Sequence, residues 1–96
     1  MIRHTVLFRL SHPAGSDAEA AFLRDARILG SIPGVEHFEQ LRVLTGDDFD
    51  YSFSMEFADQ AAYSGYNEHP DHVAFVQGRW VPEVAAFLEI DYAPLP

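Results

Sequence analysis

The sequence predicts an α+β fold in which helices cover one face of a four-stranded antiparallel sheet. Two stretches alternate apolar and polar residues with a period of two, as half-buried strands do, and helix-type spacing with capping residues separates the strand candidates. Along the chain the elements come in the order β-α-β-β-α-β. With 96 residues, of which 48% are hydrophobic, the chain can build one core, so we expect a single domain over residues 1–96.

The first strand is predicted from Ile2 to Leu10. The even positions form an apolar row that includes one histidine, namely Ile2, His4, Val6, Phe8 and Leu10. His4 therefore belongs to the face that packs on the core, where an unpaired polar atom costs on the order of 1–3 kcal/mol. It needs a hydrogen-bond partner, and the candidates across the helix layer are Tyr66 and His72.

The first helix and a β-hairpin follow. The segment "SHPAGSD" interrupts the strand pattern, and Ser16 or Asp17 can cap a helix that runs to about Gly30. After "SIPGVE", strand character extends from Val35 to Leu44, "TGDDFD" is a polar turn, and a third strand runs from Tyr51 to Phe57. The apolar row of that third strand is Tyr51, Phe53, Met55 and Phe57. We expect these two strands to pair as a hairpin.

The second helical region is predicted in two pieces. Asp59 can cap a short helix that runs to Tyr66, and a second piece begins at Pro70, where the missing amide proton costs nothing, and reaches about Ala86. The expected buried stripe of this piece is Val73, Val76, Trp80 and Val84. A fourth strand from Phe87 to Tyr92 completes a ferredoxin-like protomer.

One face of such a sheet has no helix over it. Its expected residues include Leu7, Phe38 or its neighbours, and a mixture of Ser and Glu, which is too apolar for a free surface and too polar for an ordinary core. A second copy packed face to face would bury this surface and remove exposed sheet edges. The sequence thus predicts a homodimer in the form of a dimeric α+β barrel. A monomer with a partly apolar open face is the alternative.

Composition argues against several kinds of partner and chemistry. Fifteen acidic residues against six Lys plus Arg give a formal charge of −9, which opposes binding to nucleic acid or to an anionic membrane surface. The chain has no cysteine, hence no disulfide and no thiolate nucleophile. No stretch resembles a signal peptide or approaches the ~20 apolar residues of a membrane span. We expect a cytoplasmic protein without nucleic-acid or membrane partners.

The stretch "YNEHPDHVAFV" carries the residues best suited to chemistry. His72 lies in the first turn after Pro70, where the helix dipole disfavours imidazolium, so we predict that it is neutral near pH 7. A neutral imidazole can remove a proton beside a carbonyl while the hydroxyl of Tyr66 donates a hydrogen bond to the carbonyl oxygen. The alternative is that both residues only pack and cap helices.

Neither a metal nor a cofactor is predicted. The segment "HPDH" with His4 could be read as a metal site, but His69 and His72 straddle a proline, and no cysteine or HExxH-type spacing supports them. His69 and Asp71 have the character of a helix cap and a first-turn acid. No GxSxG, P-loop or GxGxxG motif is present, so nucleophilic, nucleotide and dinucleotide chemistry lack their usual motifs.

Four segments match a known pattern over essentially the whole chain. They read "IRHTVLFRL", "IPGV", "SMEFADQAAYSGYNEHPDHVAFV" and "FLEIDYAPL", and they resemble the stress-responsive A/B barrel (Dabb) domain family. The resemblance implies a dimeric α+β barrel. Through the family's best-understood enzyme, the polyketide cyclase olivetolic acid cyclase, it also implies that His72 is the catalytic base, Tyr66 the donor and His4 a pocket residue. Tyr51 would take the place of a further pocket histidine.

The resulting hypothesis is a stress-related enzyme, a cofactor-independent lyase or cyclase that acts on a small carbonyl compound. In this interpretation His72 and Tyr66 are catalytic, while His4, Tyr51 and Val76 bind a small apolar or carbonyl-containing ligand. A non-catalytic, stress-related ligand-binding dimer is the first alternative. A monooxygenase-like dimeric barrel is the second.

Overall fold

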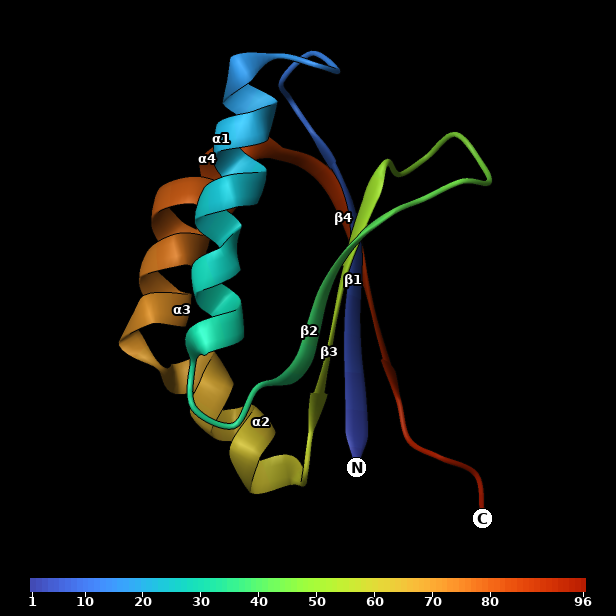
Figure 1. Cartoon of the computed structure of the whole chain (residues 1–96), viewed down its shortest axis with the longest axis vertical. Coiled ribbons are helices and arrows are strands. Elements are labelled where there is room, and N and C mark those ends of the chain that lie inside the picture. The colour runs from blue at the N-terminus through green and yellow to red at the C-terminus, as the bar shows by residue number, and fades with distance from the viewer.

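Figure 1 shows a layer of helices against one face of a four-stranded sheet, in a computed structural model that describes all 96 residues. In chain order the elements are β1 (Ile2–Leu10), α1 (Asp17–Asp25), η1 (Ala26–Ser31), β2 (Glu36–Arg42), β3 (Tyr51–Phe57), α2 (Gln60–Glu68), α3 (Pro70–Phe75), η2 (Val76–Trp80), α4 (Val81–Glu83) and β4 (Val84–Tyr92). Of these, η1 is a 3₁₀ continuation of α1, and η2 is a π-helical turn between α3 and α4. The predicted ferredoxin-like α+β fold is confirmed.

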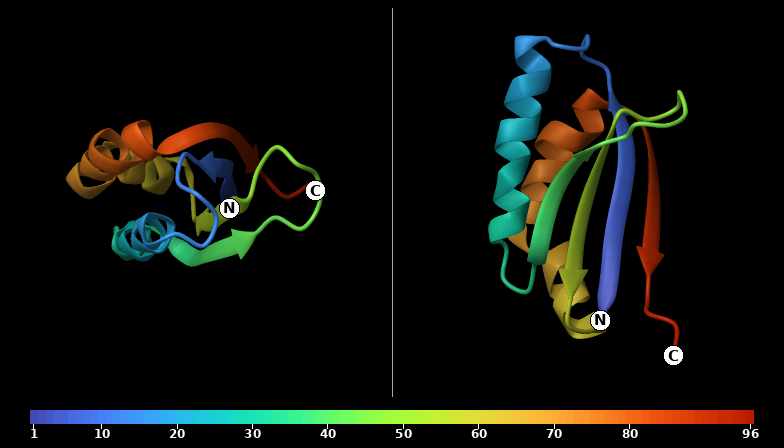
Figure 2. Two further views of the ribbon diagram at one scale, coloured as in Figure 1. Left: turned by 90° about the horizontal axis from the view of Figure 1, so that it is seen from above. Right: turned by 45° about the vertical axis from the view of Figure 1, so that its right-hand side comes forward.

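The sheet has the strand order β2-β3-β1-β4, and every neighbouring pair is antiparallel. β1 is therefore an inner strand, with β3 on one side and β4 on the other. The register pairs His4 with Met55 of β3 and with Asp91 of β4. Residues directly opposite one another share a face of a sheet, so these three form a row beneath the helices. Figure 2 shows both helical segments on this same side of the sheet.

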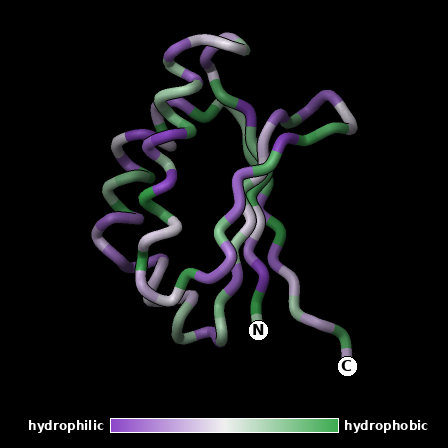
Figure 3. The backbone as a smooth tube through the Cα atoms, viewed as in Figure 1, coloured by the Kyte–Doolittle hydropathy of each residue, from purple (hydrophilic) through white to green (hydrophobic).

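The core lies between the two layers and contains the predicted apolar rows of β1 and β3. Its buried members are Val6, Phe8, Leu10, Phe22, Ala26, Leu29, Ile32, Tyr51, Phe53, Met55, Phe57, Tyr66 and Phe75. The ring of Phe8 is central, with centroids 4.7 Å from Phe53 and 5.8 Å from Phe22. In Figure 3 apolar and polar segments alternate along the chain, because each element is apolar on one side only.

The helix starts are fixed by the side chains expected to cap them. Ser16 and Asp59 each accept a hydrogen bond from a backbone amide three residues later, and His69 accepts one at Nδ1 from the amide of Asp71. Pro70 occupies the first position of α3, where no intrahelical bond is lost. His69 and Pro70 together fix where α3, the helix that carries His72, begins.

The last helical segment ends earlier than predicted, at Glu83 rather than near Ala86. β4 begins at Val84, which pairs with Leu10 of β1. The backbone amide of Ser11 also donates to the carbonyl of Glu83 over 2.8 Å. Alanine favours helices, but the ladder with β1 outweighs that local preference here.

The buried side of α3 also differs from the prediction. Phe75 is buried and Val73 is 39% exposed, whereas the predicted stripe contained Val73. The prediction assumed one regular helix through Val84, but the wider π turn of η2 breaks that period. The observed inward residues are His72, Phe75 and Val76, at helical spacings of three and four.

The uncovered sheet face is more apolar than a free surface usually is. Phe38 does not belong to it, because its ring packs on Phe53 with centroids 5.6 Å apart on the helix side. The apolar residues of the open face are Leu7, Leu41, Leu88, Ile90 and Tyr92, as the strand register places them. None of the helices in the structure is long and apolar enough to traverse a lipid bilayer.

Candidate functional site

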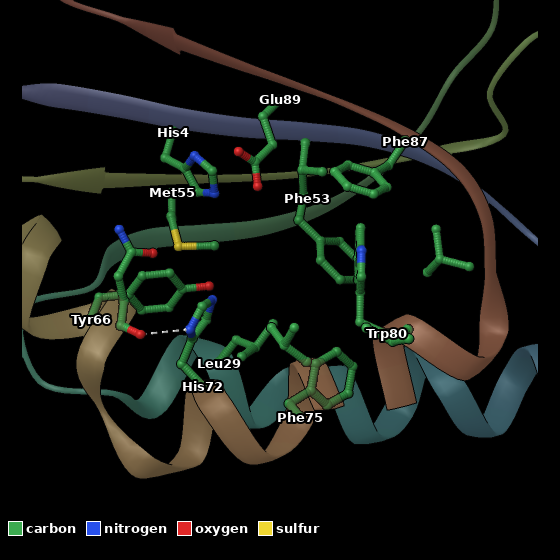
Figure 4. Close-up of a pocket in the computed structure, with 15 residues that line it drawn as sticks. His4, Leu29, Phe53, Met55, Tyr66, His72, Phe75, Trp80, Phe87 and Glu89 are labelled. Atoms are coloured by element: carbon green, nitrogen blue, oxygen red, sulfur yellow. Dashed lines mark hydrogen bonds between the residues drawn. The ribbon is translucent and has the colours of Figure 1, made fainter. Parts of the chain in front are cut away.

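A cavity of about 400 Å³ lies between the helices and the sheet (Figure 4). Fifteen residues line it, and eleven of these are hydrophobic. The exceptions are His4, Asn67, His72 and Glu89. Four of the five residues predicted for the site line this cavity, namely His4, Tyr66, His72 and Val76. Three consecutive segments, α2, α3 and η2, carry Tyr66, His72 and Val76, and the fold places them over His4 of β1, which lies far away in the sequence.

Tyr51 is not brought into the cavity. It lies on β3 beyond Phe53, which itself lines the cavity, and it borders a separate, smaller hollow with Leu23 and Gln40. Its ring packs against Phe8 with centroids 5.7 Å apart. The β3 residues that face the cavity are Phe53 and Met55. Tyr51 is on the same face of the strand, but it lies two residues farther along the strand axis, beyond the cavity.

His72 is oriented by the backbone that precedes its helix. Its Nδ1 donates to the carbonyl oxygen of Asn67 over 3.0 Å, the contact drawn in Figure 4. A neutral imidazole that donates from Nδ1 has its lone pair on Nε2. Burial lowers the pKa of His72, and the nearby His4 lowers it further, while the Asn67 carbonyl and Glu89 act in the opposite direction. The ring is therefore held as a neutral proton acceptor, with burial as the main cause.

Tyr66 lies directly beside this base. Its ring centroid is 4.5 Å from that of His72, and the residue is only 2% exposed. Burial raises the pKa of Tyr66, and the charge of Glu89 raises it further. The phenol therefore keeps its proton at neutral pH and can serve as a hydrogen-bond donor to a bound oxygen.

His4 has different partners from those predicted. Its Nδ1 lies 2.6 Å from Oδ1 of Asp91 on β4, and the hydroxyl of Tyr63 on α2 lies 2.9 Å from the same nitrogen. Tyr63 also donates to Oδ2 of Asp91 over 2.8 Å. Tyr66 is a neighbour rather than a partner, with ring centroids 6.3 Å apart. The Asp91 carboxylate accepts the Nδ1 proton of His4 and thereby orients the ring.

Four residues of this region were not identified from the sequence: Tyr63, Asn67, Glu89 and Asp91. Tyr63 and Asp91 support His4, and Asn67 supports His72. A signal for the two acids is present in "FLEIDY", where Phe87, Glu89 and Asp91 alternate with apolar residues. On a strand beside β1 this alternation directs both acids to the helix side.

The donor groups of the chain do not gather into a metal site. No group of three or more His, Cys, Asp or Glu side chains is arranged to hold a metal ion. His69, part of the "HPDH" segment, is occupied as the cap of α3.

Comparisons with known proteins agree with this architecture. A crystal structure of a Dabb family protein with a ferredoxin-like fold from Mesorhizobium loti is 63% identical to this chain, with a TM-score of 0.97, over 99% of this chain and 97% of that one. A dimeric ferredoxin-like protein of unknown function from Thermobifida fusca has 22% identity and a TM-score of 0.80, over 97% and 90% of the two chains.

A hydroxynitrile lyase from Passiflora edulis has the same fold, with 15% identity and a TM-score of 0.81 over 99% of this chain and 96% of that one. No curated protein sequence matches the chain. The sequence pattern of the Stress Responsive A/B Barrel Domain, Dabb, matches residues 2–94. The chain therefore belongs to the Dabb family.

Proposed function

We propose that this protein is a cofactor-independent lyase or cyclase that acts on a small carbonyl compound bound in the cavity. The observation that carries the proposal is the orientation of His72. Its Nδ1 is committed to the carbonyl of Asn67, so the basic Nε2 is the nitrogen available to a ligand. A lowered pKa keeps this nitrogen unprotonated at neutral pH, as a general base requires.

The proposed reaction needs only the two neighbouring side chains. His72 removes a proton from the carbon beside a carbonyl, and the electron pair moves to the carbonyl oxygen, which accepts a hydrogen bond from Tyr66. The resulting enolate carbon forms a bond with a second carbonyl carbon of the same molecule. The proton on His72 then passes to the new alkoxide. Run in reverse, the same steps break a carbon–carbon bond.

The similarity to the Passiflora edulis protein supports lyase chemistry on this fold. That protein is a hydroxynitrile lyase, so a lyase site can be built on this fold. At 15% identity the likeness concerns the fold alone, so the argument for this chain rests on His72 and Tyr66.

The reaction class can be tested without knowing the substrate. A series of aryl ketones is incubated with the protein in deuterated water, and loss of the proton beside the carbonyl is followed by NMR. We expect saturable exchange that falls by about 10²–10⁴-fold in His72→Ala and by about tenfold or more in Tyr66→Phe. Asp47→Asn, in the exposed β2–β3 loop, is the matched control.

Two results would contradict the enzymatic role. If His72→Ala catalyses the proton exchange of the ketones as fast as the wild type, His72 is not the base. Saturable ketone binding with no exchange at all would instead favour the ligand-binding alternative, for which the largely apolar cavity is the specific support.

We also propose that the functional form is a homodimer. The open sheet face exposes Leu41, Leu88 and Tyr92 by 44–51%, more apolar surface than a monomeric sheet usually leaves in water. Several structures with this fold, including the one from Thermobifida fusca, are described as dimeric. Two such faces packed together would bury these side chains in an isologous interface.

A further inference from the structure

The cavity contains one charged side chain that the proposed reaction does not use. Glu89 projects from β4 toward the cavity interior, between His4 and Phe87 (Figure 4). It makes no ion pair with any side chain of the protein. The chain has no lysine, and none of its six arginines lines the cavity. The carboxylate thus has no Lys or Arg counterion, and the only basic side chains that share the cavity with it are His4 and His72.

A carboxylate without an ion-pair partner at the wall of an apolar cavity affects which ligands bind tightly. Water hydrates it when no ligand is bound, because the residue is exposed. A ligand that fills the cavity displaces this water. Removing the water from the carboxylate weakens binding unless the ligand replaces the lost hydrogen bonds. Neutral apolar ligands should therefore bind less tightly than ligands that replace these hydrogen bonds, and anionic ligands should bind least tightly because of repulsion.

The aromatic residues beside Glu89 favour a particular kind of ligand. Phe87 shares the inward side of β4 with Glu89, and its ring meets that of Trp80 edge to face, with centroids 5.7 Å apart. Aromatic rings next to a carboxylate are a typical environment for an organic ammonium group, which is attracted to both. No set of three metal-ligating side chains surrounds Glu89, so an organic cation fits better than a metal ion.

We infer that the cavity selects apolar or aromatic ligands that carry an ammonium group, with the nitrogen at Glu89. The inference deepens the proposed function, since it assumes that the cavity is the substrate site. It places the cationic end near the Phe87 and Trp80 wall and leaves the other end of the ligand at Tyr66 and His72.

The chain provides its own reporter for a test. Trp80 is the single tryptophan and lines the cavity, so its fluorescence reports on ligand binding without a label. Three probes of nearly equal size are titrated at neutral pH: phenethylammonium, phenethyl alcohol and phenylacetate. We expect the ammonium to bind about tenfold or more tightly than the alcohol, as a charge-assisted hydrogen bond provides, and phenylacetate to bind most weakly.

The variants separate Glu89 from the rest of the cavity. Glu89→Gln keeps the size of the side chain and should bring the ammonium and alcohol affinities within about threefold of each other, with alcohol binding retained. Asp47→Asn removes the same charge from the exposed β2–β3 loop and should leave the preference unchanged. Val76→Phe narrows the cavity and should weaken binding of all three probes together.

Three outcomes would overturn the inference: equal affinities of the wild type for ammonium and alcohol, a preference that persists in Glu89→Gln, or no saturable signal with phenethylammonium. His72→Ala should keep the charge preference. If the wild type prefers the ammonium probe but does not catalyse proton exchange in ketones, only the proposed function is refuted. If it catalyses the exchange but shows no preference for the ammonium probe, only this inference is refuted.

Discussion

The Nδ1 of His4 lies 2.6 Å from Oδ1 of Asp91, its direct cross-strand partner on the neighbouring strand. The side chain of His4 is 8% exposed and that of Asp91 is 44% exposed, so the pair connects the cavity wall to solvent. Tyr63 completes the arrangement by donating to the second oxygen of the carboxylate. The buried histidine therefore has a fixed ring orientation, with Nδ1 toward Asp91.

The first prediction concerns this pair. Asp91→Ala should lower the free energy of unfolding by about 1–3 kcal/mol, because it leaves the buried Nδ1 of His4 with a weaker partner. Asp91→Asn should cost less, since an amide oxygen can still accept the Nδ1 proton. Urea denaturation measures both. A change below about 0.5 kcal/mol for Asp91→Ala, the range of an ordinary surface substitution, would contradict the role given to the pair.

The second prediction concerns the titration of His72. Its pKa should lie below the ordinary value of about 6.5, and histidine resonances followed by NMR against pH will measure it. Burial of the ring, which penalises the imidazolium form, is the main reason. His72→Gln identifies the resonance by its disappearance. A measured pKa above the ordinary value would contradict the structure.

The same titration affects stability with a definite sign. Above the ordinary pKa both the folded and the unfolded chain hold His72 neutral, and it contributes no pH dependence. As the pH falls through about 6.5, the unfolded chain takes up the proton first, so the folded state loses stability down to the lowered folded pKa. His72→Gln should therefore lose less stability than the wild type between neutral and mildly acidic pH.

The third prediction compares two helical glycines. A Cβ at Gly30 would lie 2.9–3.0 Å from the ring and Cβ of Phe38, whereas one at Gly65 would meet nothing within 4 Å. Gly30→Ala should destabilise the protein by about 1–3 kcal/mol through overpacking. Gly65→Ala should stabilise it by about 0.5–1 kcal/mol, because alanine is the better helix former. Thermal and urea unfolding will distinguish them, and equal effects would contradict this packing.

The fourth prediction concerns the dimer. Light scattering of the wild type should give about twice the chain mass of 10.8 kDa. Leu88→Arg places a charge on the open face and should give a mass near that of one chain. Leu44→Arg adds the same charge at an 87% exposed loop position and should remain dimeric. A wild-type mass near 10.8 kDa would refute the dimer.

The sheet and the helix starts were predictable because local chemistry decides them. Period-two alternation identified the inward row of β1, and Ser16, Asp59 and His69 act as the caps that their residue types favour. The bounds of β3 match the prediction at both ends, Tyr51 and Phe57. These features depend on a few consecutive residues.

The features that were missed depend on contacts between distant segments. The early start of β4 reflects pairing of Val84 with Leu10, and the rotated face of α3 reflects the π turn after Phe75. Pairing across strands likewise gives His4 its partner Asp91, although the two residues are 87 positions apart in the sequence. Tyr51 was misplaced because position along a strand, unlike the face on which it lies, does not follow from alternation.

The loop between β2 and β3, residues 43–50, projects away from the helices (Figure 1), and none of its residues lines the cavity. Gly46 in this loop adopts a positive φ of 78°, and a Cβ at that position would meet nothing within 4 Å. The substitution Asp47→Cys, next to this glycine, would introduce the only thiol in the chain. This gives a single, remote anchoring point for a dye or a solid support, so that immobilised or labelled protein keeps an unobstructed entrance for small molecules.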